Sequence, residues 1–269
     1  MTCSRAGTCC HNKAIFLNPW ELACLAREKG CGAREFRDRH TVAGGIRLRM
    51  DESTPKATCS QYDPSSGCRV YVGRPLACRL FPLGRQRQGE QAVYLHRGSE
   101  FPCLKECPEV VGLPSLTVEE FLRGQQVAAG ETAQDAYLEV SLELAEGALV
   151  LLLEGGLAER GDREALERWH ALGEMSDVER AAALPGGWLD ALIVPELPAK
   201  QDQPAEFASR HFELLQAFEA SLPEPADVDA LRERCCVRMA ASLHLGRSVG
   251  TDAKALAARW IDVARKNGA

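Results

Sequence analysis

The chain has 269 residues, of which 45% are hydrophobic and 26% are charged, and its formal net charge is −6. These proportions are typical of a globular protein, and the length suits one large domain or two ordinary ones. The N-terminus has no apolar core of a secretory signal, and the longest apolar run, Ala148 to Leu153, is far shorter than the ~20 residues that span a bilayer. We therefore expect a cytoplasmic protein with no membrane partner.

The charge is divided unevenly along the chain. Residues 1–110 hold 17 Lys and Arg against 11 Asp and Glu, a charge of +6, and residues 111–269 hold 15 against 27, a charge of −12. The basic N-terminal part could attract an anionic partner, or its arginines could offset the negative charge of clustered thiolates. Nucleic acid is disfavoured as a partner, because the basic residues are scattered and no stacking-aromatic motif accompanies them.

Cysteine is the most informative residue type in this sequence. Ten of the twelve cysteines fall within the first 107 residues, and the others are the adjacent pair Cys235 and Cys236. In a reducing compartment such a pattern indicates metal or redox chemistry more often than a disulfide scaffold. Disulfides and inert buried thiols are the alternatives.

The first helix is predicted from Pro19 to Gly30. Asn18 is a good N-cap residue, and Glu21 completes a capping-box pattern. Cys24 falls among the apolar positions of this helix and is expected to be buried. Cys31 lies just past the end of the helix and is ambiguous.

Short strands are predicted after a polar, Arg-rich linker. Residues 46–50 form one strand, and residues 58–62 and 68–72 form the arms of a hairpin around a turn at 63–67. Arg74-Pro75 begins a single helical turn that carries Cys78, and 92–97 is a further short strand. This irregular α+β unit has a thin apolar core, and such units often need a metal.

The pattern becomes helical after a boundary near residue 112. Thr117 and Glu120 form a capping box. Helices are expected over 132–154, 162–172, 177–184, 205–221, 226–245 and 252–266. On the first of these helices, Glu139, Glu143 and Glu146 form one row of acidic residues that is expected to face solvent. The expected fold is mostly α, with a cysteine-rich metal-binding module over 1–114 and a helical domain over 115–269.

The cysteines indicate a thiolate-ligated metal centre. Thiolates suit zinc, iron–sulfur clusters or copper(I). No CxxC pair of the zinc-finger kind occurs, and the adjacent Cys9 and Cys10 can face one centre only from an irregular loop. A polynuclear cluster tolerates ligands from several directions, which favours an iron–sulfur centre, such as a 4Fe-4S cluster, over zinc. Four nearby arginines, Arg5, Arg69, Arg74 and Arg79, would favour the thiolate form, or the last two could pair with Asp63 or Glu100.

The same residues carry a family resemblance over roughly residues 1–125. The segments Gly67-Cys68-Arg69-Val70-Tyr71 and Arg74-Pro75-Leu76-Ala77-Cys78-Arg79-Leu80-Phe81-Pro82, after Gly7-Thr8-Cys9-Cys10, resemble the YkgJ-type cysteine-cluster family with its zinc- or iron-chelating CxxCxxCC domain. The ligands that the residues and this resemblance together imply are Cys3, Cys9, Cys10, Cys59, Cys68, Cys78, Cys103 and Cys107.

The chain departs from the family at one position. Where the CxxCxxCC pattern has its second cysteine, this sequence has Ala6. Either the centre uses fewer ligands or another residue substitutes, with Cys103, His11 and Cys31 as candidates in that order.

The family also resembles the N-terminal part of flagellin lysine N-methylases, which implies an iron–sulfur cluster and S-adenosylmethionine. The resemblance therefore suggests methylation of protein or peptide side chains. No dinucleotide fingerprint and no CxxxCxxC signature of radical enzymes is present. The alternatives are a zinc-stabilised scaffold or binding protein without catalysis, and metal storage or delivery.

Other constellations are weaker. Glu167 and His170 have the Glu-x-x-His spacing of di-iron helices, but only one such pair is present. Cys235 and Cys236 fall on or beside an apolar helix face, which favours a buried position. Neither the substrate nor the oligomeric state follows from the sequence.

Overall fold

A computed structural model describes residues 10–53, 56–88, 91–96, 116–200 and 202–269. The helices are α1 (Pro19–Lys29), α2 (Ala33–His40), α3 (Leu76–Leu80), α6 (Val118–Gln125), α7 (Ala128–Glu154), α8 (Glu164–Glu174), α9 (Asp177–Ala183), α10 (Gly186–Ile193), α11 (Pro204–Ala220), α12 (Val228–Ser248) and α13 (Ala253–Lys266). A short 3-10 turn, η2, spans Ala43–Gly45.

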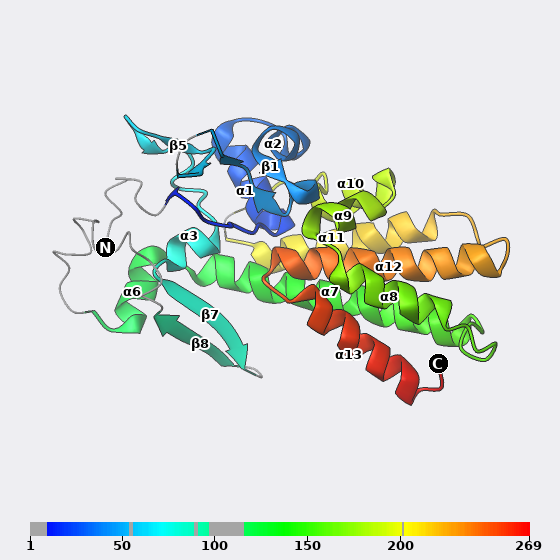
Figure 1. The fold of residues 1–269 in the computed structure, drawn as a ribbon. Coiled ribbons are helices and arrows are strands. Elements are labelled where there is room, and N and C mark those ends of the chain that lie inside the picture. The colour runs from blue at the N-terminus through cyan, green and yellow to red at the C-terminus, as the bar shows by residue number, and fades with distance from the viewer. Residues whose placement is uncertain (1–9, 54–55, 89–90, 97–115, 201) are drawn as a thin grey trace.

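In the described part of the chain, the strands form four antiparallel pairs, all before residue 97 (Figure 1). They are β1 (Thr41–Val42) with β2 (Arg47–Leu48), β3 (Met50–Asp51) with β4 (Thr58–Cys59), β5 (Tyr62–Asp63) with β6 (Gly67–Cys68), and β7 (Leu83–Gln88) with β8 (Gln91–His96). The prediction of a mostly α fold, with small strand pairs before a helical part, is confirmed.

The predicted capping boxes are confirmed. The Asn18 side chain accepts a hydrogen bond from the backbone of Glu21, and the Glu21 carboxylate accepts one from the backbone of Asn18. Thr117 and Glu120 do the same at the start of α6. Each box satisfies backbone N–H groups that have no partner inside the helix, which fixes where the helix begins.

The predicted hairpin differs from the observed pairing. The turn at 63–67 forms as expected, because the Asp63 carboxylate accepts hydrogen bonds from the backbone N–H groups of Ser65 and Ser66. However, this turn joins only β5 and β6, with Tyr62 opposite Cys68. Cys59 is paired with Met50 of β3 instead. Because β5 and β6 are only two residues long, Thr58 and Cys59 take no part in this hairpin and pair with β3 instead.

Among the described residues, two helices and the strands β1 and β7 were missed. The helix α2 replaces the expected linker, and Phe36 is its only buried residue, so it has no apolar periodicity to detect. The helix α10 begins with two glycines after Pro185. The strand β7 has the polar sequence LGRQRQ, and its Arg85 forms an ion pair with Asp135 of α7.

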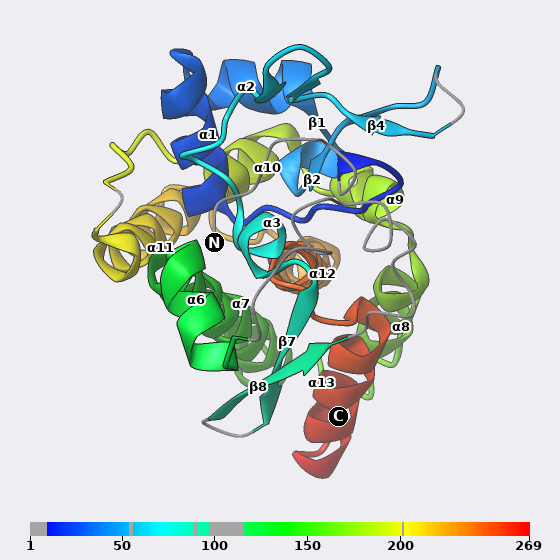
Figure 2. The ribbon, with the colours of Figure 1, turned by 90° about the vertical axis from the view of Figure 1, so that its left-hand side faces the viewer.

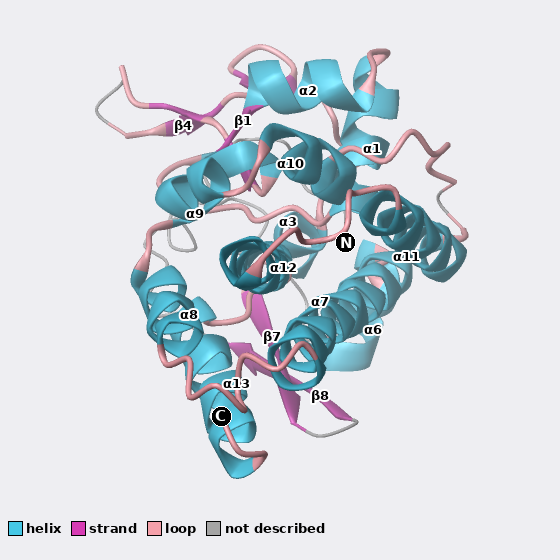
Figure 3. Ribbon diagram, turned by 90° about the vertical axis from the view of Figure 1, so that its right-hand side faces the viewer, coloured by secondary structure: helices cyan, strands magenta, loops and turns pink. Residues whose placement is uncertain are grey.

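The helical part is organised around α7 and α12, which lie side by side along most of their length (Figure 1). Ser141 and Ser242 exchange hydrogen bonds with each other's backbone carbonyls across this contact, at 3.0 and 2.7 Å. The helix α8 packs against α13 on one side (Figure 3). The acidic line Glu139, Glu143 and Glu146 is exposed, as a solvated face requires.

The cysteine-rich part packs directly on these helices (Figure 2). One set of buried apolar side chains continues from Leu17 through Phe36 to Leu144 and Leu243. A Cβ on Gly45, where φ is +115°, would lie 2.4 Å from Ile193 of α10, so only glycine allows η2 to approach this closely. Division of the chain at residue 114 stays a prediction. None of the described helices is long and apolar enough to cross a membrane.

Candidate metal centre

Four of the predicted ligands line one small pocket. Cys10, Cys59, Cys68 and Cys78 come from four separate places in the chain and surround a cavity of about 80 Å³. The rest of the lining is mostly apolar, with two cations and one amide: Lys13, Ile15, Leu48, Met50, Gln61, Val70, Tyr71, Arg74, Pro75, Ala77 and Phe81.

Backbone pairing brings Cys10 and Cys59 to the same side of the pocket. His11 pairs with Thr58 as an isolated antiparallel bridge, and the N–H of Asn12 donates to the carbonyl of Ala57 at 2.8 Å. Because Cys10 and Cys59 each adjoin a residue of this bridge, the two thiols approach the cavity from neighbouring segments.

Cys68 is positioned by the tight turn between β5 and β6. Gly67, with φ of +76°, ends that turn, and the Asp63 carboxylate also forms an ion pair with Arg69. These hydrogen bonds from Ser65 and from Arg69 hold the pKa of Asp63 well below its usual range. The turn is therefore closed by a carboxylate that stays ionised at neutral pH.

Cys78 is positioned by a buried carboxylate on another helix. Oε1 of Glu21 accepts a hydrogen bond of 2.6 Å from the N–H of Leu76, the first residue of α3. Burial raises the pKa of Glu21 to about 7, although these backbone hydrogen bonds and nearby Arg79 act in the opposite direction. The capping box of α1 thereby also anchors the helical turn that carries Cys78.

Arg74 and Arg79 donate to backbone carbonyls, whereas Arg69 pairs with the carboxylate of Asp63. Arg79 donates to the carbonyls of Val72, Arg74 and Gln125. It therefore links residues 68–79, here called the cysteine loop, to the end of α6. Arg74 lies 3.8 Å over the ring of Tyr71 and donates to its carbonyl. The alternative pairing of Arg74 and Arg79 with Asp63 is wrong, because both guanidinium groups donate to backbone carbonyls and Asp63 pairs with Arg69. The other alternative partner, Glu100, lies outside the described residues.

The remaining described cysteines lie away from the pocket. Cys24, Cys235 and Cys236 are buried in the apolar core, as expected. Burial raises the pKa of the Cys24 thiol to about 12 and that of Cys236 to about 11. Cys31 follows α1 and does not line the pocket. These thiols are therefore poor sources of thiolate at neutral pH.

Four predicted ligands, Cys3, Cys9, Cys103 and Cys107, lie outside the described residues, as does the departure at Ala6. Of the candidates to replace position 6, Cys103 is also outside, and His11 packs edge-on against Tyr62 at 5.6 Å. Within the part of the chain that the structure describes, no three His, Cys, Asp or Glu side chains form a group that could hold a metal ion.

Gln61 is a pocket residue that the sequence analysis missed. Its side chain is only 1% exposed, and its Oε1 has no hydrogen-bond partner among the described residues. Its amide nitrogen donates to Ser60. A buried carbonyl oxygen without a partner is costly, so it fits a pocket that holds a polar or metal-bound group. No sequence pattern marks Gln61; only its place beside Ser60 and Cys59 hints at it.

A second, wider cleft of about 480 Å³ adjoins the cysteine pocket. The two share Lys13, Ile15, Ala77 and Phe81, so these residues form the wall between them. Lys13 lies 3.9 Å over the ring of Phe81 in this wall. The far side of the cleft belongs to the helical part, at Gln134 and Ser248. Both parts of the chain thus face the cleft beside the cysteines.

Comparison with known proteins bears on the N-terminal part alone. Residues 2–95 match the family model CxxCxxCC, which is described as a "Putative zinc- or iron-chelating domain". This match supports metal binding, and it includes the four cysteines of the pocket. No curated protein and no solved structure matches the chain. Over residues 2–95, this chain is therefore similar to the CxxCxxCC family.

Proposed function

We propose that the chain is a metalloprotein whose cysteine pocket holds an iron–sulfur cluster. The observation that carries the proposal is the convergence of Cys10, Cys59, Cys68 and Cys78 on one cavity. Cys3, Cys9, Cys103 and Cys107 are the further ligands that we propose. A cysteine-rich centre of this kind is best kept in a reducing compartment, which is consistent with a cytoplasmic location.

The donor set supports a cluster over a single zinc ion. The thiols come from a loop, two strands and a helical turn, and a polynuclear cluster accepts ligands that arrive from such different directions. Lys13 and Arg74 also line the pocket and would offset the negative charge of several thiolates. The unpartnered Oε1 of Gln61 offers one further oxygen donor or acceptor. Zinc is the second candidate, because it also binds thiolates.

Anaerobic purification with metal and sulfide analysis tests this proposal. We expect iron and acid-labile sulfide in stoichiometric amounts and a brown protein with broad visible absorption. Cys68→Ser and Cys78→Ser should each lose metal, whereas Cys31→Ser should retain it because Cys31 does not line the pocket. A colourless protein with stoichiometric zinc would establish the zinc alternative. Unchanged metal content in both pocket variants would refute the pocket as the site.

The more specific proposal is a methylase-like role for the protein. It rests on the resemblance to flagellin lysine N-methylases, and the cleft beside the cysteine pocket is where we would place a peptide or protein substrate. Isothermal titration of S-adenosylmethionine into the metal-replete protein tests it. Saturable binding is expected, and its absence would leave a metal-stabilised scaffold as the favoured function. Rapid transfer of the metal to a chelator would instead favour storage or delivery.

A further inference from the structure

A groove in the described part of the molecule shares no lining residue with the cysteine pocket. It has a volume of about 780 Å³ and lies between α8 and α13. Its lining includes Arg163, Leu166 and His170 of the α8 region and Ile261 and Arg265 of α13. Sites for small molecules generally have volumes of about 300–1,000 Å³, so the groove has the size of a ligand site.

The helices α8 and α13 approach closely at one end of their contact, where the facing residues are small, and diverge at the other end, where the facing residues are larger. The helices run antiparallel, and a Cβ on Gly173 would lie 2.8 Å from the Cβ of Ala257, so the backbones approach closely there. Toward the start of α8 the facing residues become Leu166, Ile261 and Arg265. These longer side chains hold the helices apart and open the groove.

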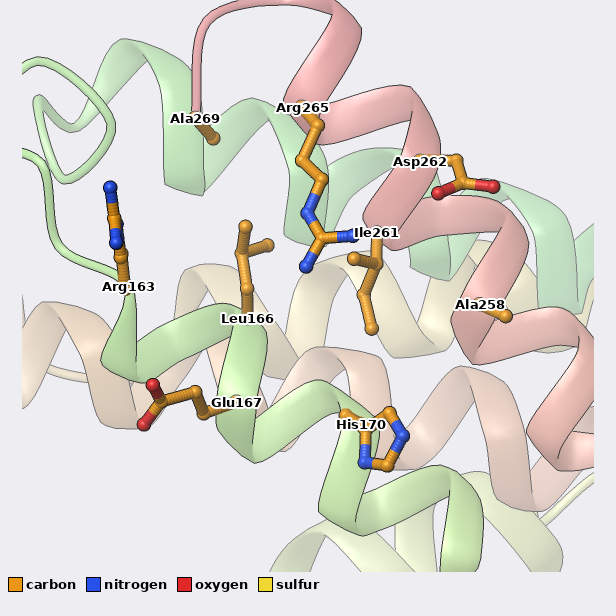
Figure 4. Close-up of a pocket in the computed structure, with 9 residues that line it drawn as sticks. All are labelled: Arg163, Leu166, Glu167, His170, Ala258, Ile261, Asp262, Arg265 and Ala269. Carbon is orange, nitrogen blue, oxygen red and sulfur yellow. The ribbon is translucent and has the colours of Figure 1, made fainter.

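The floor of the groove is apolar, and its charged lining residues are two arginines, Arg163 and Arg265, and two carboxylates, Glu167 and Asp262. Figure 4 shows Leu166 and Ile261 in the space between the helices, with Arg163 and Arg265 on either side of Leu166. In the same view Asp262 points away from α8 and Glu167 points away from α13, while Ala269 is drawn between the two arginines. Leu166 and Ile261 are 7% and 5% exposed, so they form a floor rather than a protruding patch.

The two arginines are available to a ligand. Neither guanidinium group has a hydrogen-bond or ion-pair partner among the described residues, whereas most arginines of the helical part are paired, such as Arg168 with Glu233 and Arg232 with Asp162. Arginine donates several N–H groups in a planar fork that matches a carboxylate or phosphate. Two such forks beside an apolar floor are complementary to an anion that carries an apolar body.

We propose that the groove between α8 and α13 binds a small amphipathic anion. Its carboxylate or phosphate head lies between Arg163 and Arg265, and its apolar body covers Leu166 and Ile261. This site is independent of the metal centre, so the proposal stands or falls separately from the proposed function.

Isothermal titration of the full, metal-replete chain tests the proposal with three probes. Octanoate has a head and an apolar body, octanamide has the same body without charge, and inorganic phosphate has charge without the body. We expect one saturable site for octanoate, with affinity at least about tenfold above that for octanamide and for phosphate. Octyl phosphate against octanoate then distinguishes the two head groups. Equal affinity for octanoate and octanamide would overturn the assignment of the arginines.

Variants locate the site. Arg163→Gln and Arg265→Gln should each weaken octanoate binding by about 1.5- to fivefold, because exposed charge pairs contribute modestly. Arg259→Gln is the matched control, since Arg259 is an exposed arginine of the same helix outside the lining. Ala258→Trp fills the groove from an exposed position and should abolish binding without unfolding the chain.

Full affinity in Ala258→Trp would place the octanoate elsewhere and refute the proposal. So would a dimer that dissociates in Ala258→Trp, as measured by sedimentation, because a second copy would then be the occupant.

Discussion

The buried carboxylate of Glu21 should make the stability of this protein fall as the pH rises through neutrality. Glu21 links the start of α1 to Leu76 of the cysteine loop, and burial raises its pKa from the ordinary value of 4.5 to about 7. The folded state therefore holds the proton more tightly than the unfolded chain does. This contribution to stability is fully present below pH 4.5 and is lost as the pH rises through 7.

The size of the effect follows from the pKa. A rise from 4.5 to about 7 corresponds to about 3 kcal/mol, since each pH unit is worth about 1.4 kcal/mol. Glu21→Gln keeps the shape and cannot ionise. Its amide leaves one backbone N–H, of Asn18 or Leu76, without an acceptor, which costs about 1–3 kcal/mol at every pH. Relative to the original protein, the variant should therefore gain about 3 kcal/mol between pH 4.5 and pH 8.

Urea unfolding of both proteins between pH 4.5 and 8 measures this difference. Groups that titrate equally in the two proteins, and proton release linked to the metal, cancel in the comparison. Glu28→Gln, on an exposed position of the same helix, controls for the removal of one acidic side chain. A free-energy difference between the Glu21→Gln protein and the original that stays constant over this range would show that Glu21 ionises as freely in the folded state as in the unfolded chain.

Three further predictions concern other buried positions. Gln61→Met should lower iron retention, but the metal-free protein should be as stable as the original or up to about 3 kcal/mol more stable, because the substitution removes an unpartnered carbonyl. Metal analysis measures the iron content, and urea unfolding measures the stability. Unchanged iron content would exclude a role for the amide. Gly45→Ala should lower the free energy of unfolding by roughly 2–4 kcal/mol, because φ is positive at this position and the new Cβ would collide with Ile193. Gly32→Ala is the control, since a Cβ there would meet nothing within 4 Å. Equal melting temperatures of the two variants would contradict the prediction. Burial lowers the pKa of His244 from 6.5 to about 4, so stability should be lost as the pH falls from 6.5 through 4, by about 3 kcal/mol, and His244→Leu should remove that component of the acid unfolding curve.

Most of the helices could be predicted because their signals are local. Caps such as Asn18 and Thr117 determine where helices begin, and they depend on neighbouring residues only. The helix α2 and the strand β7 escaped because their polar sequences acquire structure from distant contacts, such as that of Arg85 with Asp135. Local propensity carries no information about such contacts.

The pocket could be predicted as a set of cysteines but not as a geometry. The pairing of His11 with Thr58, and of Met50 with Cys59, is long-range in sequence and uses strands of one or two residues. Such short strands have no alternating pattern from which the register can be derived. Gln61 was missed for the same reason, because its importance lies in its burial and its unpartnered oxygen rather than in its residue type.

Arg79 makes the cysteine loop and the helical part mechanically interdependent. One guanidinium group donates to Val72 and Arg74 on the loop and to Gln125 at the end of α6. If the loop moved away from α6, the hydrogen bond between Arg79 and Gln125 would break, so the position of the loop and that of the end of α6 are energetically coupled. By thermodynamic linkage, whatever tightens the loop around a ligand steadies the end of α6, and whatever binds α6 in that position raises the affinity of the loop for its ligand by the same factor.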